Sequence, residues 1–357
     1  MNITIHPLHV PDSLDAPDAA DFLAMVACGN DQWSRDSGLD GLLDEDPLDL
    51  LTQWHNTVDY TKVGLLARAG DDAIGFGAVE YGNETDHTAE VWVELSAAAE
   101  KTDAHDLILS RLESIAREHG RTTLSLYSVH PVDQHAERLP SPTGSGSIPR
   151  DDRAERLLRN GFCLQQVERL SSFDLTGSFD EVQHLLDEAL RAAGPDYRVV
   201  SWIGRTPDEY VDGYAAILQR LSTDIPSGDL EIEAQRWDAA RVRRREDRLE
   251  RAGREIGVAL VIHTPTGDVA AFNDLVAAAD RSRPTEQYGT LVTPEHRGHK
   301  LGSIVKCAGL IQWRSAMPQC PSIITWNAEE NRFMLDVNER VGFRPVACSG
   351  AWEKKLV

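Results

Sequence analysis

The segment Tyr288-Gly-Thr-Leu-Val-Thr-Pro-Glu-His-Arg-Gly-His-Lys-Leu-Gly302 decides how the rest of the chain is interpreted. Its apolar, β-branched start over residues 288–293 predicts a buried strand, which Pro294 ends. A polar turn with two glycines follows, and apolar residues then recur at helical spacing. A strand, a glycine-containing turn and a helix in this order direct free backbone amides and the positive end of a helix dipole at one point. A phosphate or pyrophosphate binds well there.

Physical chemistry alone leaves two interpretations of this segment open. It is either an anion cradle, to which His299 and Lys300 add positive charge, or an ordinary connection between a strand and a helix. The segment lacks the Gly-Lys-Ser/Thr of a Walker loop and the Gly-x-Gly-x-x-Gly of a dinucleotide-binding fold.

A more specific pattern lies within the same segment. Val292-x-Pro-x-x-Arg297-Gly298-x-x-x-Gly302 resembles the acetyl-CoA loop of the GNAT acetyltransferase superfamily, whose pattern is Gln/Arg-x-x-Gly-x-Gly/Ala. Arg297 and Gly302 match the ends of that pattern, and Lys300 stands where a glycine is usual. The strand, helix and Gly-Phe end that follow the loop in this family are similar to three further segments: Ile323-Ile-Thr-Trp-Asn327, Asn331, and Val337-Asn-Glu-Arg-Val-Gly-Phe343.

The resemblance is strong over residues 255–345 and implies a fold, an activity and a co-substrate. The fold is mixed α/β, with two tandem GNAT units that each contain a mostly antiparallel sheet flanked by helices. The activity is transfer of an acetyl group from acetyl-CoA to a primary amine of a small molecule, without a metal. The residues that the resemblance assigns to acetyl-CoA binding are Thr290, Leu291, Val292, Arg297, Gly298, His299, Lys300, Leu301, Gly302, Ser303, Asn327 and Asn331. The last two are also good helix or strand caps.

Acyl transfer to an amine also needs catalytic groups. In this family a backbone amide of the loop strand polarises the donor carbonyl, here at Leu291 or Val292. A carboxylate or a chain of waters must accept the amine proton. The candidates are Glu286 and, in a segment that usually lines the acceptor site in this family, Asp229, Glu231 and Glu233. Each of them taken singly is better explained as a surface acid. The family often protonates the leaving thiolate from a tyrosine, whose position Asn338 occupies here. An asparagine is a poor proton donor, which leaves Tyr288 or water for that step.

Composition narrows the class of protein. The chain has 357 residues, 41% of them hydrophobic and 26% charged, as in a soluble protein of two domains. A net charge of −22 argues against nucleic acid or an anionic membrane as partner. It suits a cationic acceptor, although solubility explains it too. Five scattered cysteines and no apolar signal or spanning segment predict reduced thiols in a cytoplasm. The preference for Arg over Lys is typical of a high-GC bacterial chain.

The two halves of the chain repeat one order of elements. We therefore expect a degenerate GNAT-like domain over residues 1–176 and an acetyl-CoA-binding GNAT domain over residues 177–357. The loop at residues 95–104 lacks the arginine and both glycines, so the first half is expected to be structural or a wall of the acceptor pocket. In the first half we expect strands at residues 1–7, 63–67, 73–81, 89–95, 122–129 and 165–175 and helices at 18–27, 47–58, 104–119 and 153–160.

Other features are less informative. The charged helix at residues 238–252 is interpreted as a solvated, internally paired face, with one arginine left as a possible contact to the 3′-phosphate of CoA. The pair His296-x-x-His299 is not expected to bind metal, and residues 131–149 are expected to be a flexible loop.

Several alternatives stay open. The layout is similar to that of the mycothiol synthase family, but other amine acceptors fit equally well. A non-catalytic acyl-CoA sensor and a protein-lysine or N-terminal acetyltransferase are the rival functions, and either a monomer or a homodimer is compatible with the sequence.

Overall fold

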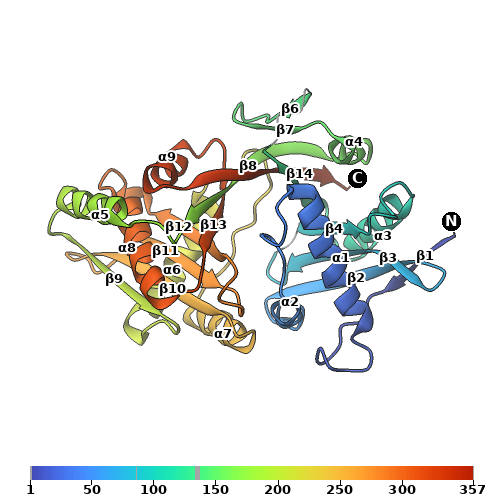
Figure 1. The fold of residues 1–357 in the computed structure, drawn as a ribbon, viewed down its shortest axis with the longest axis horizontal. Coiled ribbons are helices and arrows are strands. Elements are labelled where there is room, and N and C mark those ends of the chain that lie inside the picture. Colours follow the sequence, from blue (N-terminus) through green and yellow to red (C-terminus); the bar gives the residue numbers. More distant parts are fainter. Residues whose placement is uncertain (1, 86, 133–136, 357) are drawn as a thin grey trace. The chain divides into compact units, whose positions relative to one another are not determined.

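The computed structural model describes residues 2–85, 87–132 and 137–356, so Met1 and residues 133–136 of the expected loop lie outside the described residues. The chain forms two compact units (Figure 1). Unit 1 comprises Met1–Glu168, Ser227–Glu233 and Ala347–Val357, and unit 2 comprises Arg169–Pro226 and Ala234–Val346. This division differs from the expected boundary between residues 176 and 177, because two segments of the second half belong to unit 1.

Unit 1 is a mixed sheet with helices on both faces. Its strands follow the order β1 (Ile3–Pro7), β2 (Tyr60–Ala69), β3 (Asp72–Gly82), β4 (Thr88–Leu95), β5 (Thr123–Pro131), β14 (Arg344–Lys355) and β8 (Cys163–Asp174). The last two strands continue into unit 2, to which residues 344–346 and 169–174 belong. Its helices are α1 (Ala20–Ser37), α2 (Pro47–Trp54), α3 (Ala104–Glu118) and α4 (Asp152–Arg159), and a short hairpin joins β6 (Arg138–Pro140) to β7 (Ser147–Pro149). Alternation along the strands fills two cores: Leu65 packs with α3, and Leu66 packs with α1 and α2.

Helix α1 is longer than the sequence predicts. The expected helix ends at residue 27, because the following residues are polar and include Gly29. The observed helix continues to Ser37 and ends at Gly38, whose φ is 71°. Contacts with β4 hold the extra turns: Gln32 Oε1 accepts from the Leu95 amide at 2.6 Å, and Arg35 Nη2 donates to the Leu95 carbonyl at 2.7 Å. Tertiary hydrogen bonds therefore override the weak local preference.

Unit 2 repeats the arrangement. From β8 its strands follow the order β13 (Ser322–Ala328), β12 (Thr285–Val292), β11 (Val269–Ala277), β10 (Glu255–His263) and β9 (Tyr197–Ile203). Its helices are α5 (Asp180–Ala193), α6 (Asp208–Asp224), α7 (Ala239–Arg251), α8 (Leu301–Ala316) and α9 (Arg332–Val341), with a 3₁₀ turn, η1 (Pro294–His296), before α8. One core joins the sheet to α6 and α7, and two others join it to α5 and α8. The expected mixed α/β fold is thus confirmed.

The last strand of the chain does not lie where the sequence predicts. A closing strand for the second domain is expected near residues 345–355. In the structure, Ala347–Lys355 of β14 pair antiparallel with residues 123–131 of β5, inside unit 1. Strand alternation reveals that a segment is a strand but not which strand it pairs with.

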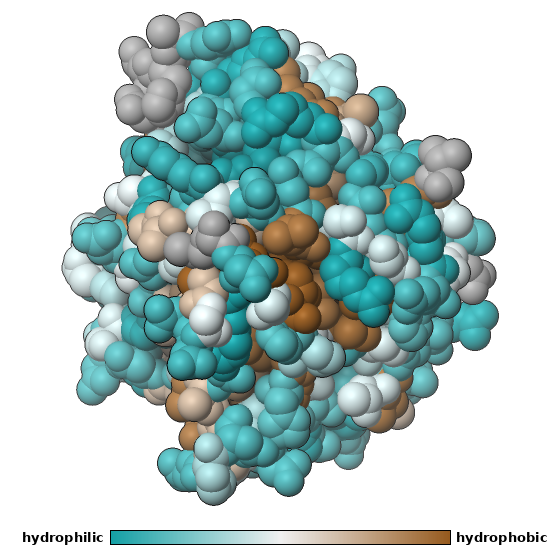
Figure 2. All heavy atoms as spheres, turned by 90° about the vertical axis from the view of Figure 1, so that its right-hand side faces the viewer, coloured by the Kyte–Doolittle hydropathy of each residue, from teal (hydrophilic) through white to brown (hydrophobic). Residues whose placement is uncertain are grey.

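Two further features concern the hydropathy of the chain. The face drawn in Figure 2 is mostly hydrophilic around a smaller hydrophobic patch. Among the described residues, no helix is both long enough and apolar enough to cross a membrane.

Candidate functional site

The connection between β12 and α8 has the backbone of a cradle. Gly298 has a φ of 89° and Lys300 a φ of 56°, and Lys300 is the one non-glycine residue with positive φ in the described parts of the chain. A side chain in this conformation is strained, which explains why a glycine is favourable at position 300. The Lys300 ammonium forms an ion pair with Glu188 of α5.

The N-terminus of α8 is open. No side chain caps it, and the first amides of a helix have no acceptor within the helix. A Cβ built on Gly302 would meet only Val292, at 3.6 Å, so the glycine leaves free space in front of these amides. Arg297 and His299 are exposed beside it. This arrangement of amides, dipole and cations fits a pyrophosphate.

Rings from three elements gather next to the cradle. Tyr197 Oη lies 3.0 Å from His296 Nδ1, and its ring centroid lies 5.1 Å from that of His299. Burial and the neighbouring His263 lower the pKa of His296. Within residues 2–85, 87–132 and 137–356, no group of three or more His, Cys, Asp or Glu side chains is arranged to hold a metal.

Strands β12 and β13 diverge just before the cradle. They pair in parallel at Thr285–Ile323 and Glu286–Ile324. At the next positions the side chains bridge instead: Gln287 Nε2 donates to Thr325 Oγ1 at 2.9 Å. Lys306 Nζ of α8 donates to Gln287 Oε1 at 2.9 Å. This lysine is wholly buried, and burial lowers its pKa to about 7.

A β-bulge shapes β12 at the same level. Asp274 of β11 pairs with Gly289 and Leu275 with Gln287, which leaves Tyr288 as the extra residue. The Tyr288 side chain is exposed as a result. Arg254 connects two of the expected catalytic residues, because it donates to Glu286 Oε1 at 2.9 Å and to Tyr288 Oη at 3.3 Å.

Structural comparison identifies the fold. The model is similar to a tandem GNAT protein from the clavulanic acid biosynthesis pathway, with a TM-score of 0.72 and 19% identity over 99% of this chain and 98% of that one. The chain has the tandem GNAT fold. A GCN5-related N-acetyltransferase from Sphaerobacter thermophilus gives a TM-score of 0.59 and 10% identity over 99% and 95% of the two chains. A GCN5-related glucosamine N-acetyltransferase region of a fungal multi-domain enzyme gives 0.62 and 13% over 99% and 38%.

The sequence comparisons are negative. Neither the models of known protein families nor the sequences of curated proteins match this chain. At identities below 20% the structural likeness establishes the GNAT fold alone, and the activity has to be argued from the site.

The asparagines expected near the co-substrate lie on the second half of the GNAT motif. Asn331 caps α9 by accepting from the Met334 amide at 3.3 Å. Asn338, in the usual tyrosine position, is buried and donates to Asn327 Oδ1 at 2.7 Å. Asn338 Oδ1 has no hydrogen-bond partner among the described residues. The hydrogen bond between Asn338 and Asn327 therefore holds both side chains in place, and Asn338 Oδ1 is available to accept a further hydrogen bond.

Glu233 is held by the start of β4. It belongs to unit 1, where its carboxylate accepts from the Thr88 amide at 2.8 Å and from Thr88 Oγ1 at 2.6 Å, at the start of β4. The expectation that this acid serves as a catalytic base stays a prediction. The segment docks on an edge of unit 1, and local sequence carries no signal for such a contact.

Sequence reasoning missed a buried network in the cradle-bearing GNAT unit. Tyr214 Oη donates to Asp274 Oδ2 at 2.8 Å, and Arg245 Nη1 lies 2.9 Å from the same carboxylate. The guanidinium of Arg245 also lies over the Tyr288 ring, 5.4 Å from its centroid. The sequence analysis expects a solvated face for this helix. Arg245 is an exception, because its guanidinium takes part in this buried network. The available signal was the pair Asn273 and Asp274, two polar residues inside an otherwise apolar strand.

Proposed function

We propose that unit 2 is an acetyl-CoA-dependent N-acetyltransferase that acts on a primary amine of a small molecule. The observation that carries the proposal is the open, glycine-lined N-terminus of α8, placed where β12 and β13 diverge. The similarity to a GCN5-related glucosamine N-acetyltransferase region supports an amine acceptor.

The residues present fit acetyl-CoA. The amides of Leu301, Gly302 and Ser303 would hold the pyrophosphate, with Arg297 and His299 as countercharges. Asn327 and Asn331 would contact the pantetheine arm. Bound there, the co-substrate supplies an activated acetyl thioester.

The chain contributes positioning and proton transfer. A backbone amide at Leu291 or Val292 would donate to the carbonyl oxygen, where charge develops. The Glu286 carboxylate, oriented by Arg254, would accept the amine proton through water. The Tyr288 hydroxyl, exposed by the bulge, would return a proton to the departing sulfur. Asn338 would act by orienting Asn327 rather than by proton transfer.

Calorimetric titration with acetyl-CoA tests the binding part. We expect wild type to bind and Gly302→Ala to bind at least tenfold more weakly, since its methyl group enters the cradle but has room in the free protein. Arg297→Glu should also weaken binding, whereas the same charge change at exposed Arg159, in unit 1, should not. Equal binding by wild type and Gly302→Ala would exclude this cradle as the site.

A non-catalytic acyl-CoA sensor is the second candidate, and the asparagine at position 338 is the observation that favours it. Thiol release from acetyl-CoA in the presence of an amine library distinguishes the two. Binding with turnover supports the enzyme, and binding without turnover of any amine supports the sensor.

A further inference from the structure

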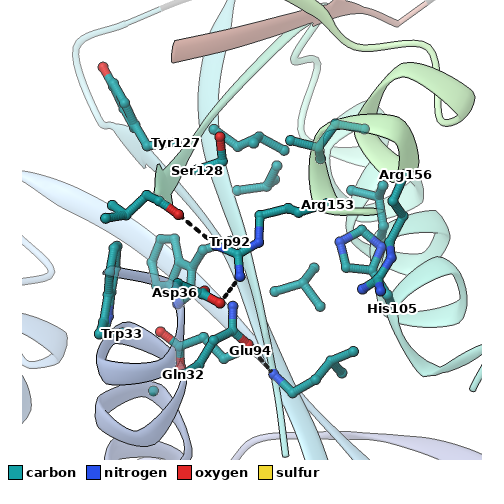
Figure 3. Close-up of a pocket in the computed structure, with 18 of the residues that line it drawn as sticks. Gln32, Trp33, Asp36, Trp92, Glu94, His105, Tyr127, Ser128, Arg153 and Arg156 are labelled. Carbon is teal, nitrogen blue, oxygen red and sulfur yellow. Dashed lines mark hydrogen bonds and ion pairs between the residues drawn. The ribbon is translucent and has the colours of Figure 1, made fainter. Parts of the chain in front are cut away.

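A cavity lies between the diverging strands of unit 1 (Figure 3). Strands β4 and β5 pair in parallel only as far as Glu90 and Ser125. Beyond that point, residues of β4, β5, α1, α3 and α4 surround about 80 Å³ of space. An engineered cavity of about 150 Å³ holds a benzene molecule. The space in unit 1 therefore suits the end of a ligand rather than a whole cofactor.

The cationic side chains at this cavity are already paired. Arg153 forms an ion pair with Asp36 and donates to the Val129 carbonyl at 3.2 Å, as Figure 3 shows. Arg156 lies 3.3 Å from the carboxylate of Glu100. These guanidinium groups have little positive potential left for an anionic ligand.

Glu94 is different, because its carboxylate has no hydrogen-bond or ion-pair partner among the described residues. It projects from β4 into the cavity and approaches Gly29 in the middle of α1. A Cβ on Gly29 would lie 2.7 Å from Glu94 Oε2. Glycine is less favourable than alanine in a helix interior. Gly29 therefore lowers the stability of α1, but it leaves the space that the Glu94 carboxylate occupies.

The walls of the cavity favour a cation. Trp33, Trp92 and Tyr127 are among its lining residues, and Trp92 stands two positions before Glu94 on β4. The faces of aromatic rings attract ammonium groups. The lining side chains thus combine one unpaired acid with aromatic surface.

The loop after β4, residues 96–103, contains no glycine and so lacks the glycines that shape the cradle of unit 2. Three amides in and just after this loop are engaged locally: Ala99 donates to Ser96 O at 2.9 Å, Thr102 donates to Ala99 O at 2.9 Å, and Ala104 donates to Thr102 Oγ1 at 3.3 Å. An acyl-CoA would therefore find no glycine-lined cradle at this loop, whose one basic side chain, Lys101, is exposed.

We propose that this cavity binds the ammonium end of a primary amine, with Glu94 as its counter-ion. The site is separate from the cradle of unit 2 and does not rest on the acyl transfer proposed there. The chemical class is an alkyl amine whose terminal aminoalkyl group enters the cavity.

Proton release is a signature of this binding. Burial, with a contribution from Glu45, raises the pKa of Glu94 to about 8, so the carboxyl group is mostly protonated at pH 7. An ammonium group favours the ionised form, so binding should release a proton and strengthen as the pH rises from 7 to 8. The neighbouring His105 stays neutral there, because burial and Arg156 lower its pKa to about 4. Burial, with contributions from Glu90 and Glu168, raises the pKa of Tyr127, which also lines the cavity. Other titratable or charged groups around it are Cys28, Asp31, Arg35, Asp36, Glu100, Arg153 and Arg156.

The test is calorimetric titration of the full chain with n-butylamine at pH 7 in two buffers of different ionisation enthalpy. n-Butanol is the neutral probe of the same shape. We expect butylamine to bind with proton release, butanol to bind at least tenfold more weakly, and Glu94→Gln to lose both the tighter binding and the proton release. Gly29→Ala should weaken binding by displacing the carboxylate, and Glu118→Gln, the same change at an exposed site on α3, should have no effect.

Hydrogen exchange then locates the ligand. Protection by butylamine of peptides from α1 and β4 supports the proposal. Protection confined to unit 2, equal binding of butanol, or unchanged binding by Glu94→Gln would each overturn it. Protection of α1 and β4 by acetyl-CoA, with no effect of the amine, would assign the cavity to an acyl donor instead. Because the readouts lie in unit 1, failure here leaves the proposal for unit 2 untouched.

Discussion

Replacement of Lys306 by methionine should stabilise unit 2. The wholly buried amine has one hydrogen-bond acceptor, Gln287 Oε1, and its pKa falls from 10.5 to about 7. The difference is about 3.5 pKa units, which corresponds to roughly 5 kcal/mol of folding free energy lost below pH 7. Methionine fills a similar volume without this cost. It leaves Gln287 Oε1 without its donor, which costs about 1–3 kcal/mol, so we expect a net gain of about 2–3 kcal/mol at pH 7.

The pH dependence has a definite sign. Between the folded pKa of about 7 and the unfolded pKa of 10.5, the unfolded chain binds one more proton than the folded chain. The stability of wild-type unit 2 should therefore rise with pH in this window, by up to about 1.4 kcal/mol per pH unit. Lys306→Met should lack this slope, because it removes the titrating group.

Urea unfolding at pH 7, 8 and 9 measures both effects. Hydrogen exchange of peptides from α8 and β12 reports unit 2 separately, which matters because a chain of two units need not unfold in one step. Lys101→Met, at an exposed site in unit 1, is the control for loss of one lysine. A destabilised Lys306→Met variant that keeps the wild-type slope would refute the reasoning.

Three further predictions concern unit 2. Lys300→Gly relieves the positive φ but loses the Glu188 ion pair, so unfolding free energies should stay within about 1 kcal/mol of wild type, whereas Lys300→Ala should lose about 1 kcal/mol more than Lys300→Gly. Arg245→Met leaves the Asp274 carboxylate buried without its cation and should cost about 3–5 kcal/mol in urea unfolding, most of it recovered by adding Asp274→Asn. Asn331→Ala should lower stability by about 1 kcal/mol through loss of the α9 cap. An unchanged affinity of this variant for acetyl-CoA would show that Asn331 is a cap alone.

The sequence predicts those features that depend on neighbouring residues. The strand, turn and helix around Gly298 are recognisable because periodicity and glycine placement are local, and the repeated order of elements follows from the same signals. The αL backbone of Lys300 is a consequence of the family pattern, in which a glycine is usual at that position.

Long-range contacts account for what the sequence does not predict. The C-terminal half of α1 is held by bonds to Leu95, and Glu233 docks at the start of β4; neither partner is near in sequence. The position of an acid in the unit 1 cavity cannot be predicted from the sequence for a similar reason. Gly29 and Glu94 are 65 positions apart, and only the fold reveals that one makes room for the other.

The position of β14 in unit 1 sets an order of events during synthesis. The strand that lies between β5 and β8 comes after the whole of unit 2 in the chain. At 5–20 residues per second, a ribosome needs roughly 10–40 s to proceed from the end of β8 to the end of β14. Throughout that time the edge of β5 that pairs with β14 has no partner strand. Unit 1, whose synthesis begins first, is therefore completed only after unit 2 has been synthesised. Residues 1–168 expressed alone would lack an interior strand, and a nascent chain stalled before β14 would expose a sheet edge to chaperones or to other chains.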